Sequence, residues 1–180
     1  GKPQATNLSD EINETVMRNV ITNLRRFIRN PDDDFARGEL MWASAMAENG
    51  MLKLGKQTDF QCHMIEHAVG AYTDCNHGQG LAVIHPALYR RLLEAGKEKL
   101  ARMSETVWGV KGTTTEETAM RGVEALEAFI REIGLPTHWS EMGITDESLL
   151  RAAADTCFIT SGCCRQLTRD EIFELVMERM

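Results

Sequence analysis

The sequence predicts an all-α fold, a multi-helix bundle of about eight helices in one domain that spans all 180 residues. Three observations lead to this prediction. Apolar residues recur at spacings of three and four along almost the whole chain, as they do on the buried face of α-helices. The strict alternation of apolar and polar residues that marks β-strands is missing from the sequence. Glycines and prolines separate the periodic segments, where helices are expected to end.

The first residues, 1–4, are expected to form a loop, and the first helix then runs from about Ser9 to Asn30. It begins at the N-cap signal Ser-Asp-Glu and ends before Pro31. Its single apolar stripe consists of Ile12, Val16, Val20, Leu24, Phe27 and Ile28. The acidic run 32–34 is interpreted as the solvated start of a second helix, from Phe35 to about Leu54, because helix N-termini favour negative charge.

The other expected helices are bounded by similar start and stop signals. They are Thr58–Thr73, His77–Leu93, Lys97–Val110, Thr115–Ile133, Asp146–Cys157 and Thr168–Glu178. Thr168 and Glu171 form a capping box at the start of the last one. Most methionines and tryptophans fall at apolar helical positions, which predicts core packing, although Trp42 and Met46 could instead line a pocket.

Composition excludes several classes of function. The formal net charge of −7 argues against a surface for nucleic acid or for anionic membranes, because both select clustered Lys and Arg. The sequence contains neither a membrane-spanning apolar run nor a recognisable signal peptide. The five cysteines, of which Cys163 and Cys164 are adjacent, show no disulfide spacing. Reduced thiols and a cytoplasmic location are therefore expected.

Three of the five histidines, His63, His67 and His77, lie close together in the sequence. The i, i+4 spacing places His63 and His67 on one helix face, with Cβ atoms roughly 5–6 Å apart. A turn before the next helix could bring His77 back beside them, and Gly78 and Gly80 would permit close backbone approach. Such a cluster can hold one divalent ion, although histidines at this spacing also occur as ordinary core or surface residues. Periodicity alone favours His63 and His67 as the pair of ligands.

Other motifs of catalysis are missing. Glu66 does not complete an H-E-x-x-H motif, in which the glutamate directly follows the first histidine. The glycines at 78 and 80 lack the third glycine and the preceding strand of a dinucleotide-binding loop. The chain is therefore not expected to bind a dinucleotide by itself in the usual way.

The stretch from His63 to Pro86 reads HMIEHAVGAYTDCNHGQGLAVIHP, with the pattern H-x3-H-x9-H-G. It resembles the signature of iron-containing (group III) alcohol dehydrogenases, in particular their butanol dehydrogenase branch. Other stretches that fit this family are 30–33, 48–50, 134–136 and 165–168. The sequence departs from the usual pattern at 162–165, which reads Gly-Cys-Cys-Arg in place of Gly-Asn-Pro-Arg, and at 68–70.

The resemblance implies that the chain is the C-terminal, dehydroquinate synthase-like helical domain of a two-domain enzyme. The N-terminal nucleotide-binding domain would be absent from this chain. Family members bind Fe²⁺, or sometimes Zn²⁺, through one Asp and three His. Here His63 and His77 would be metal ligands, and His67 would be a catalytic residue that lines the pocket. The remaining ligands would come from a D-x3-H motif upstream of Gly1, so that Gly1 is expected to be a cut end. Cys157 could approach the same pocket.

The implied reaction is the NAD(P)-linked interconversion of primary alcohols and aldehydes, in which the metal stabilises a developing alkoxide. The implied partners are the small-molecule substrate, NAD(P) held by the missing domain, and a second subunit in a possible homodimer of the full-length enzyme. The chain alone is expected to be inactive. Two alternatives stay open: a stand-alone helical module that binds a metal or a partner without redox activity, and a related polyol dehydrogenase of the glycerol type.

Overall fold

The computed structural model describes residues 7–159 and 161–180, and the regular elements in these ranges are all helical. The expected loop at residues 1–4 lies outside the described residues. The eight α-helices are α1 (Leu8–Arg29), α2 (Asp34–Glu48), α3 (Gln61–Thr73), α4 (His77–Arg91), α5 (Leu93–Met103), α6 (Thr115–Glu132), α7 (Glu147–Thr156) and α8 (Arg169–Met177). Three short segments join them, η1 (Met51–Lys53), the π-helical η2 (Ser104–Trp108) and η3 (Trp139–Met142). The predicted all-α bundle is confirmed.

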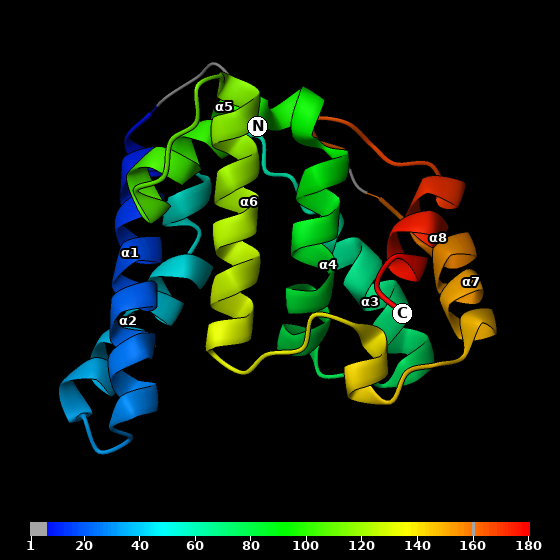
Figure 1. Ribbon diagram of the computed structural model, residues 1–180, viewed down its shortest axis with the longest axis horizontal. Coiled ribbons are helices and arrows are strands. Elements are labelled where there is room, and N and C mark those ends of the chain that lie inside the picture. The colour runs from blue at the N-terminus through cyan, green and yellow to red at the C-terminus, as the bar shows by residue number, and fades with distance from the viewer. Residues whose placement is uncertain (1–6, 160) are drawn as a thin grey trace.

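The helices form three neighbouring groups (Figure 1). The α1–α2 hairpin lies at one side, α5 and α6 pack together in the middle, and α3, α4, α7 and α8 form the other side. The main core lies in this last group, where Ile65, Ile84, Leu150 and Leu175 are fully enclosed. Trp139 is also fully buried there, and its indole Nε1 donates a hydrogen bond to the Val176 carbonyl at 2.9 Å. Helices α3 and α4 are thus held in place by packing in this hydrophobic core.

Helix α1 lies at the edge of the bundle and is only half-buried along its predicted apolar stripe. Ile28, at the end of that stripe, is 47% exposed. The helix starts earlier than the Ser-Asp-Glu signal predicts, because the Asn7 side chain caps it and forms a capping box with Asp10. Ser9 is instead buried and donates to the Leu54 carbonyl.

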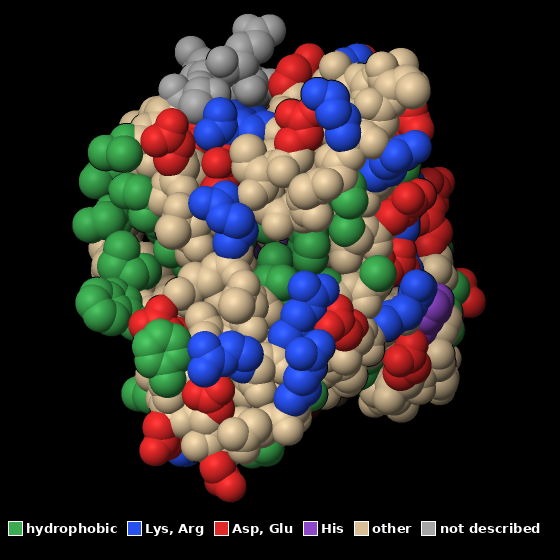
Figure 2. Space-filling model, turned by 60° about the vertical axis from the view of Figure 1, so that its left-hand side comes forward, with side chains coloured by type: hydrophobic (Ala, Val, Ile, Leu, Met, Phe, Trp, Pro, Cys, Tyr) green, Lys and Arg blue, Asp and Glu red, His purple; other side chains and the backbone are tan. Residues whose placement is uncertain are grey.

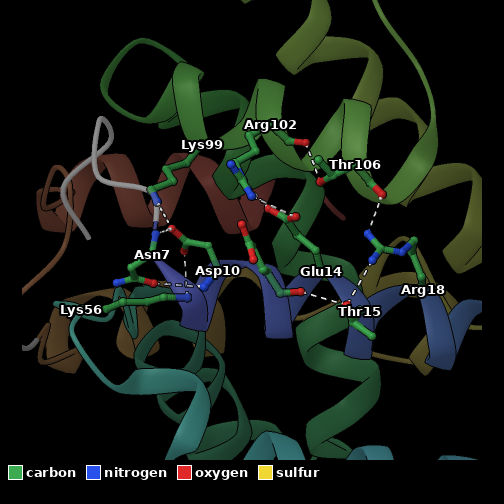
Figure 3. A network of polar contacts seen from close by, with 10 residues as sticks. Asn7, Asp10, Glu14, Thr15, Arg18, Lys56, Lys99, Arg102 and Thr106 are labelled. Carbon is green, nitrogen blue, oxygen red and sulfur yellow. Dashed lines mark hydrogen bonds and ion pairs between the residues drawn. The ribbon is translucent and has the colours of Figure 1, made fainter.

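Polar contacts join α1 to α5 and to the segment before α3 (Figure 3). Asp10 accepts from Lys56 and Lys99 at 2.8 and 2.6 Å. One turn later, Glu14 pairs with Arg102 on α5. These contacts connect residues far apart in the sequence, so they fix how the edge helix sits on the rest of the bundle.

Helix α2 is shorter than predicted and exposes large apolar side chains. It ends at Glu48 because Gly50 follows in the left-handed region, with a φ of 85°. Met41 and Trp42 are 70% and 69% exposed, so core packing is wrong for these two residues. Apolar side chains gather on one flank of the molecule in Figure 2. Within the described residues, no helix is both long and apolar enough to cross a membrane.

Candidate metal centre

A tight turn between α3 and α4 brings the three histidines together. His63 and His67 lie one helical turn apart on α3. The helix ends at Thr73 and is followed by Asp74, whose φ of 54° is left-handed and reverses the chain. The Asn76 side chain then caps α4 by accepting from the Gln79 N–H at 3.2 Å, and His77 is the first residue of α4. The predicted return of His77 beside the other two histidines is confirmed.

The three imidazoles face a common point. One ring nitrogen from each of His63, His67 and His77 lies within 4.8 Å of the others. The ring centroid of His77 is 5.2 Å from each of the other two, which are 6.0 Å apart. His63 is half-buried, whereas His67 and His77 are exposed. The cluster therefore opens toward the surface, and the geometry would let an ion contact any of the three.

Glu66 lies beneath the cluster and was missed as a functional residue by the sequence reasoning. Its side chain is 3% exposed, and its Oε2 contacts Nδ1 of His77 directly. Its Oε1 lies 3.8 Å from the Cys75 Sγ. The contact with His77 joins residues on two helices, so no spacing rule within one helix could have identified it.

The surroundings of His63 favour a neutral ring. The ring stacks on Phe60, with centroids 4.7 Å apart. Burial lowers the pKa of His63, and the neighbouring charges of His77 and His67 lower it further. A neutral imidazole offers a lone pair, which is the form that binds a metal ion.

A cavity of about 920 Å³ adjoins the cluster and has His63 in its wall. Its apolar part includes Phe60, Leu88 and Tyr89, and its polar part includes Asp10 and Arg102. His85 also lines it, 5.4 Å from Tyr89 between ring centroids. Burial, with a smaller contribution from His63, lowers the pKa of His85 to about 4. His85 is therefore neutral at pH 7 and forms part of the wall, as expected of a structural histidine.

Two further residues singled out in the sequence lie elsewhere. Cys157 is 7% exposed in the core, where its Sγ donates to the Met64 carbonyl at 3.5 Å. It packs on α3 next to His63 and is not part of the cavity wall. Trp42 lies on the outer side of α2, away from that wall. Cys157 thus approaches α3 beside His63 without lining the cavity, and the hypothesis that Trp42 and Met46 line it is not supported.

The unusual Gly-Cys-Cys-Arg loop packs against the start of α3. Gly162 has a φ of 108°, and a Cβ there would lie 2.8 Å from the Thr58 carbonyl oxygen, so glycine is required. The backbone N–H of Cys164 donates to Asp59 at 3.3 Å, and Cys164 lines the cavity. The departure from the usual family pattern thus changes a side chain near the site while the glycine that shapes the loop is retained.

The residues present fit a divalent transition metal. Three imidazole nitrogens within reach of one another are a donor set that both Fe²⁺ and Zn²⁺ accept. A carboxylate on the outer nitrogen of one of these histidines is a common feature of metal sites. Nδ1 of His77 contacts the Glu66 carboxylate in this way, which leaves Nε2 of His77 available to the ion.

Comparison with known proteins gives consistent results. A sequence model described as Fe-containing alcohol dehydrogenase family, C-terminal, matches residues 2–180. NADH-dependent butanol dehydrogenase A of Clostridium acetobutylicum is 31% identical over 173 residues, which are 93% of this chain and 44% of that protein. NADPH-dependent aldehyde reductase YqhD of Escherichia coli is 28% identical over 148 residues, covering 82% of this chain and 38% of that protein.

Solved structures show the same architecture. The crystal structure of NADH-dependent butanol dehydrogenase A from Thermotoga maritima superposes with a TM-score of 0.90 at 26% identity, covering 99% of this chain and 47% of that one. A substrate- and cofactor-free form of the aldehyde reductase YqhD gives a TM-score of 0.89 at 25% identity, covering 99% of this chain and 48% of that one. The chain thus spans less than half the length of each of these relatives.

Proposed function

Because the chain belongs to the Fe-containing alcohol dehydrogenase family, as its C-terminal part, we propose that it is the metal-binding domain of an NAD(P)-linked oxidoreductase. The full enzyme would interconvert primary alcohols and aldehydes. The observation that carries this proposal is the cluster of His63, His67 and His77, whose ring nitrogens lie within 4.8 Å of one another beside a cavity.

Within this cluster, we assign His63 and His77 as metal ligands and His67 as a catalytic residue. His63 is held neutral by burial, and His77 is oriented by Glu66, so both can present a lone pair. His67 is exposed and contacts no carboxylate among the described residues, which suits a group that exchanges protons with solvent. An aspartate and a further histidine, supplied by the part of the enzyme that precedes this chain in its relatives, would complete the ligand set for Fe²⁺ or Zn²⁺.

The proposed reaction moves a hydride and a proton. The carbinol carbon of the alcohol loses a hydride to the nicotinamide of NAD(P)⁺, the hydroxyl oxygen loses its proton, and the aldehyde and NAD(P)H form. A divalent ion bound at the cluster would supply Lewis-acid stabilisation of negative charge on the substrate oxygen. His67 would accept the hydroxyl proton and pass it to solvent, since its ring lies beside those of His63 and His77. The cavity wall around Phe60 and Leu88 would exclude water from the alkyl part of the substrate.

The nicotinamide cofactor would be held by the N-terminal domain, for which the relatives provide both NADH- and NADPH-dependent examples. A homodimer of the full enzyme remains part of the proposal. None of the five cysteines, all of which lie in the described ranges, forms a disulfide, which supports a reducing compartment such as the cytoplasm.

The metal centre is tested by titrating the chain with Co²⁺ and Zn²⁺ in a calorimeter. We expect one weak site, abolished in His63→Ala and His77→Ala. The matched control is His138→Ala, because His138 is a half-exposed histidine that contacts Glu141 away from the cluster. Absence of saturable binding in the unaltered chain, or unchanged binding in His63→Ala, would contradict the metal centre.

The assignment as one domain of a longer enzyme is tested by an assay of butanol oxidation with NAD⁺ and NADP⁺, after anaerobic addition of Fe²⁺. We expect no turnover by this chain. The cluster supplies three histidines without the aspartate and the further histidine of the proposed ligand set, and the sequence has no dinucleotide-binding motif. Robust turnover would show that the chain is an enzyme by itself. A stand-alone metal-binding module would also bind metal without turnover. The assay is therefore repeated with the full-length protein, whose activity distinguishes a domain of a longer enzyme from a stand-alone module.

A further inference from the structure

We propose that Glu66 and Gly80 act as a positioning pair for His77, in which the carboxylate fixes the ring and the glycine leaves room for the carboxylate. This inference rests on the proposed metal centre, since it states how one of the ligands is oriented. Neither residue would touch the ion or the substrate. Their role would be to hold the Nε2 lone pair of His77 toward the common point of the cluster.

The Glu66 carboxylate is buried against His77. Its side chain is 3% exposed, and Oε2 contacts Nδ1 of His77. Among the described residues, no Lys or Arg lies within ion-pair distance of it, and its one basic neighbour is the imidazole of His77. A buried carboxylate without a cationic partner is costly, because it loses its hydration without compensation. A cation bound on the far nitrogen of His77 would provide that compensation through the ring.

The contact between Glu66 and His77 selects one tautomer of the imidazole. A carboxylate accepts hydrogen bonds, so Nδ1 of a neutral His77 must carry the proton and donate it to Oε2. Nε2 is then unprotonated and free to bind a metal ion. Histidine ligands that donate their second nitrogen to a carboxylate have fixed orientation and raised basicity, and loss of that partner weakens metal binding by roughly 10–100-fold.

Gly80, which lies on α4 one turn after His77, leaves space for the Glu66 side chain. A Cβ at residue 80 would be 2.8 Å from Cγ and 2.9 Å from Oε1 of Glu66, distances that real Cβ atoms do not show. Cys75 Sγ would be 3.3 Å away on the same side, so the carboxylate could not simply move there. A side chain at 80 would therefore force the Glu66 side chain to shift, and with it the carboxylate that contacts His77.

The neighbouring Gly78 offers a matched control. It lies in the same first turn of α4, but a Cβ there would be 3.5 Å from the nearest atom, Asn76 Oδ1, which is an ordinary contact. Gly80→Ala and Gly78→Ala therefore make the same chemical change in the same helix. Only Gly80→Ala is expected to disturb the Glu66–His77 contact.

The experiment combines two measurements on the 180-residue chain, with thermal melts to verify folding of each variant. Calorimetric and visible-absorption titrations with Co²⁺ measure affinity and ligand field. Long-range ¹⁵N–¹H correlation spectra of the metal-free protein, above the usual pKa of histidine, report which nitrogen of His77 carries the proton. We expect Gly80→Ala and Glu66→Ala to bind Co²⁺ roughly 10–100-fold more weakly and to lose the Nδ1–H tautomer, while Gly78→Ala resembles the unaltered chain.

The outcomes separate this inference from the proposed function. If the unaltered chain binds no Co²⁺, the metal centre is contradicted, and the tautomer measurement still decides whether Glu66 fixes His77. If Co²⁺ binds but affinity and tautomer are unchanged in Gly80→Ala and Glu66→Ala, the positioning pair is overturned and the metal centre stands. Should Gly80→Ala fail to fold, Glu66→Gln, which is close to Glu in volume, must weaken Co²⁺ binding for the inference to survive.

Discussion

The buried ion pairs of Asp10 make a specific prediction about stability and pH. Burial raises the pKa of this carboxyl, but hydrogen bonds from Lys56, Lys99 and the Asn7 N–H outweigh that effect and lower it from 3.8 to about 2. The Asp10 side chain is 11% exposed and that of Lys56 is 16% exposed, so solvent screens the pair only weakly. Asp10→Asn removes the charge that holds α1 to α5 and to the segment before α3 (Figure 3).

The magnitude follows from the difference in pKa between the folded and unfolded states. A fall from 3.8 to about 2 corresponds to about 2 kcal/mol of folding free energy at about 1.4 kcal/mol per unit. Because the folded-state pKa is the lower one, this stability is fully present above the unfolded value of 3.8 and is lost as the pH falls through about 2. Roughly half of it should remain near pH 3.

The assay is urea unfolding followed by far-UV circular dichroism, at pH 7 and at several values down to about pH 3. We expect Asp10→Asn to unfold with about 2 kcal/mol less free energy at pH 7, and the difference from the unaltered chain to shrink toward pH 3. Asp32→Asn is the control, because Asp32 is an exposed carboxylate at the α1–α2 turn and should change stability by less than about 0.5 kcal/mol. A loss that equals the control, or one that stays constant down to pH 3, would refute the reasoning.

Three further substitutions test the packing of two glycines and one buried hydrogen bond. Gly122→Ala places a Cβ 1.9 Å from the Ser104 Oγ at the crossing of α6 with the π-helical segment, so it should destabilise the fold by about 1–3 kcal/mol in thermal unfolding. Gly38→Ala, in an open position of α2, should instead stabilise it by about 0.5–1 kcal/mol, and equal effects at the two glycines would contradict the packing argument. Trp139→Phe removes the donor to the Val176 carbonyl in a fully buried site and should cost about 1–3 kcal/mol, whereas a neutral result would show that water reaches that carbonyl.

Local signals in the sequence predicted the helices well. The capping box at Thr168 and Glu171 is present at the start of α8, and Asp33 caps α2 within the acidic run. Where the boundaries differ, the reason is also local. Helix α1 starts at Leu8 because Asn7 caps it in a capping box with Asp10, and α2 ends early because Gly50 is left-handed. Caps and turns depend on a few consecutive residues, so they can be identified from the sequence.

Burial was harder to predict, because the helical period shows that a face is apolar but not whether another element covers it. The stripe of α1 is only half-buried at the edge of the bundle, and Trp42 is largely exposed on α2. Cys157, considered as a pocket residue, is packed in the core against α3. The order of helices around the bundle decides these cases, and that order depends on how distant segments cross.

In the candidate site, too, some features follow from local sequence and others only from the packing of the helices. The sequence by itself determined that His63 and His67 share one helix face and predicted that a turn could bring His77 beside them. The resemblance to a family added the roles of His63 and His77 as ligands and of His67 as a catalytic residue. Only the tertiary structure brought His77 within reach, through the left-handed Asp74, and placed Glu66 against its ring. It also decided that Gly80 leaves space for that carboxylate and that Asp10 pairs with Lys99 across the bundle. Spacing within a helix follows from its fixed period, whereas contacts between helices depend on packing angles that no single segment encodes.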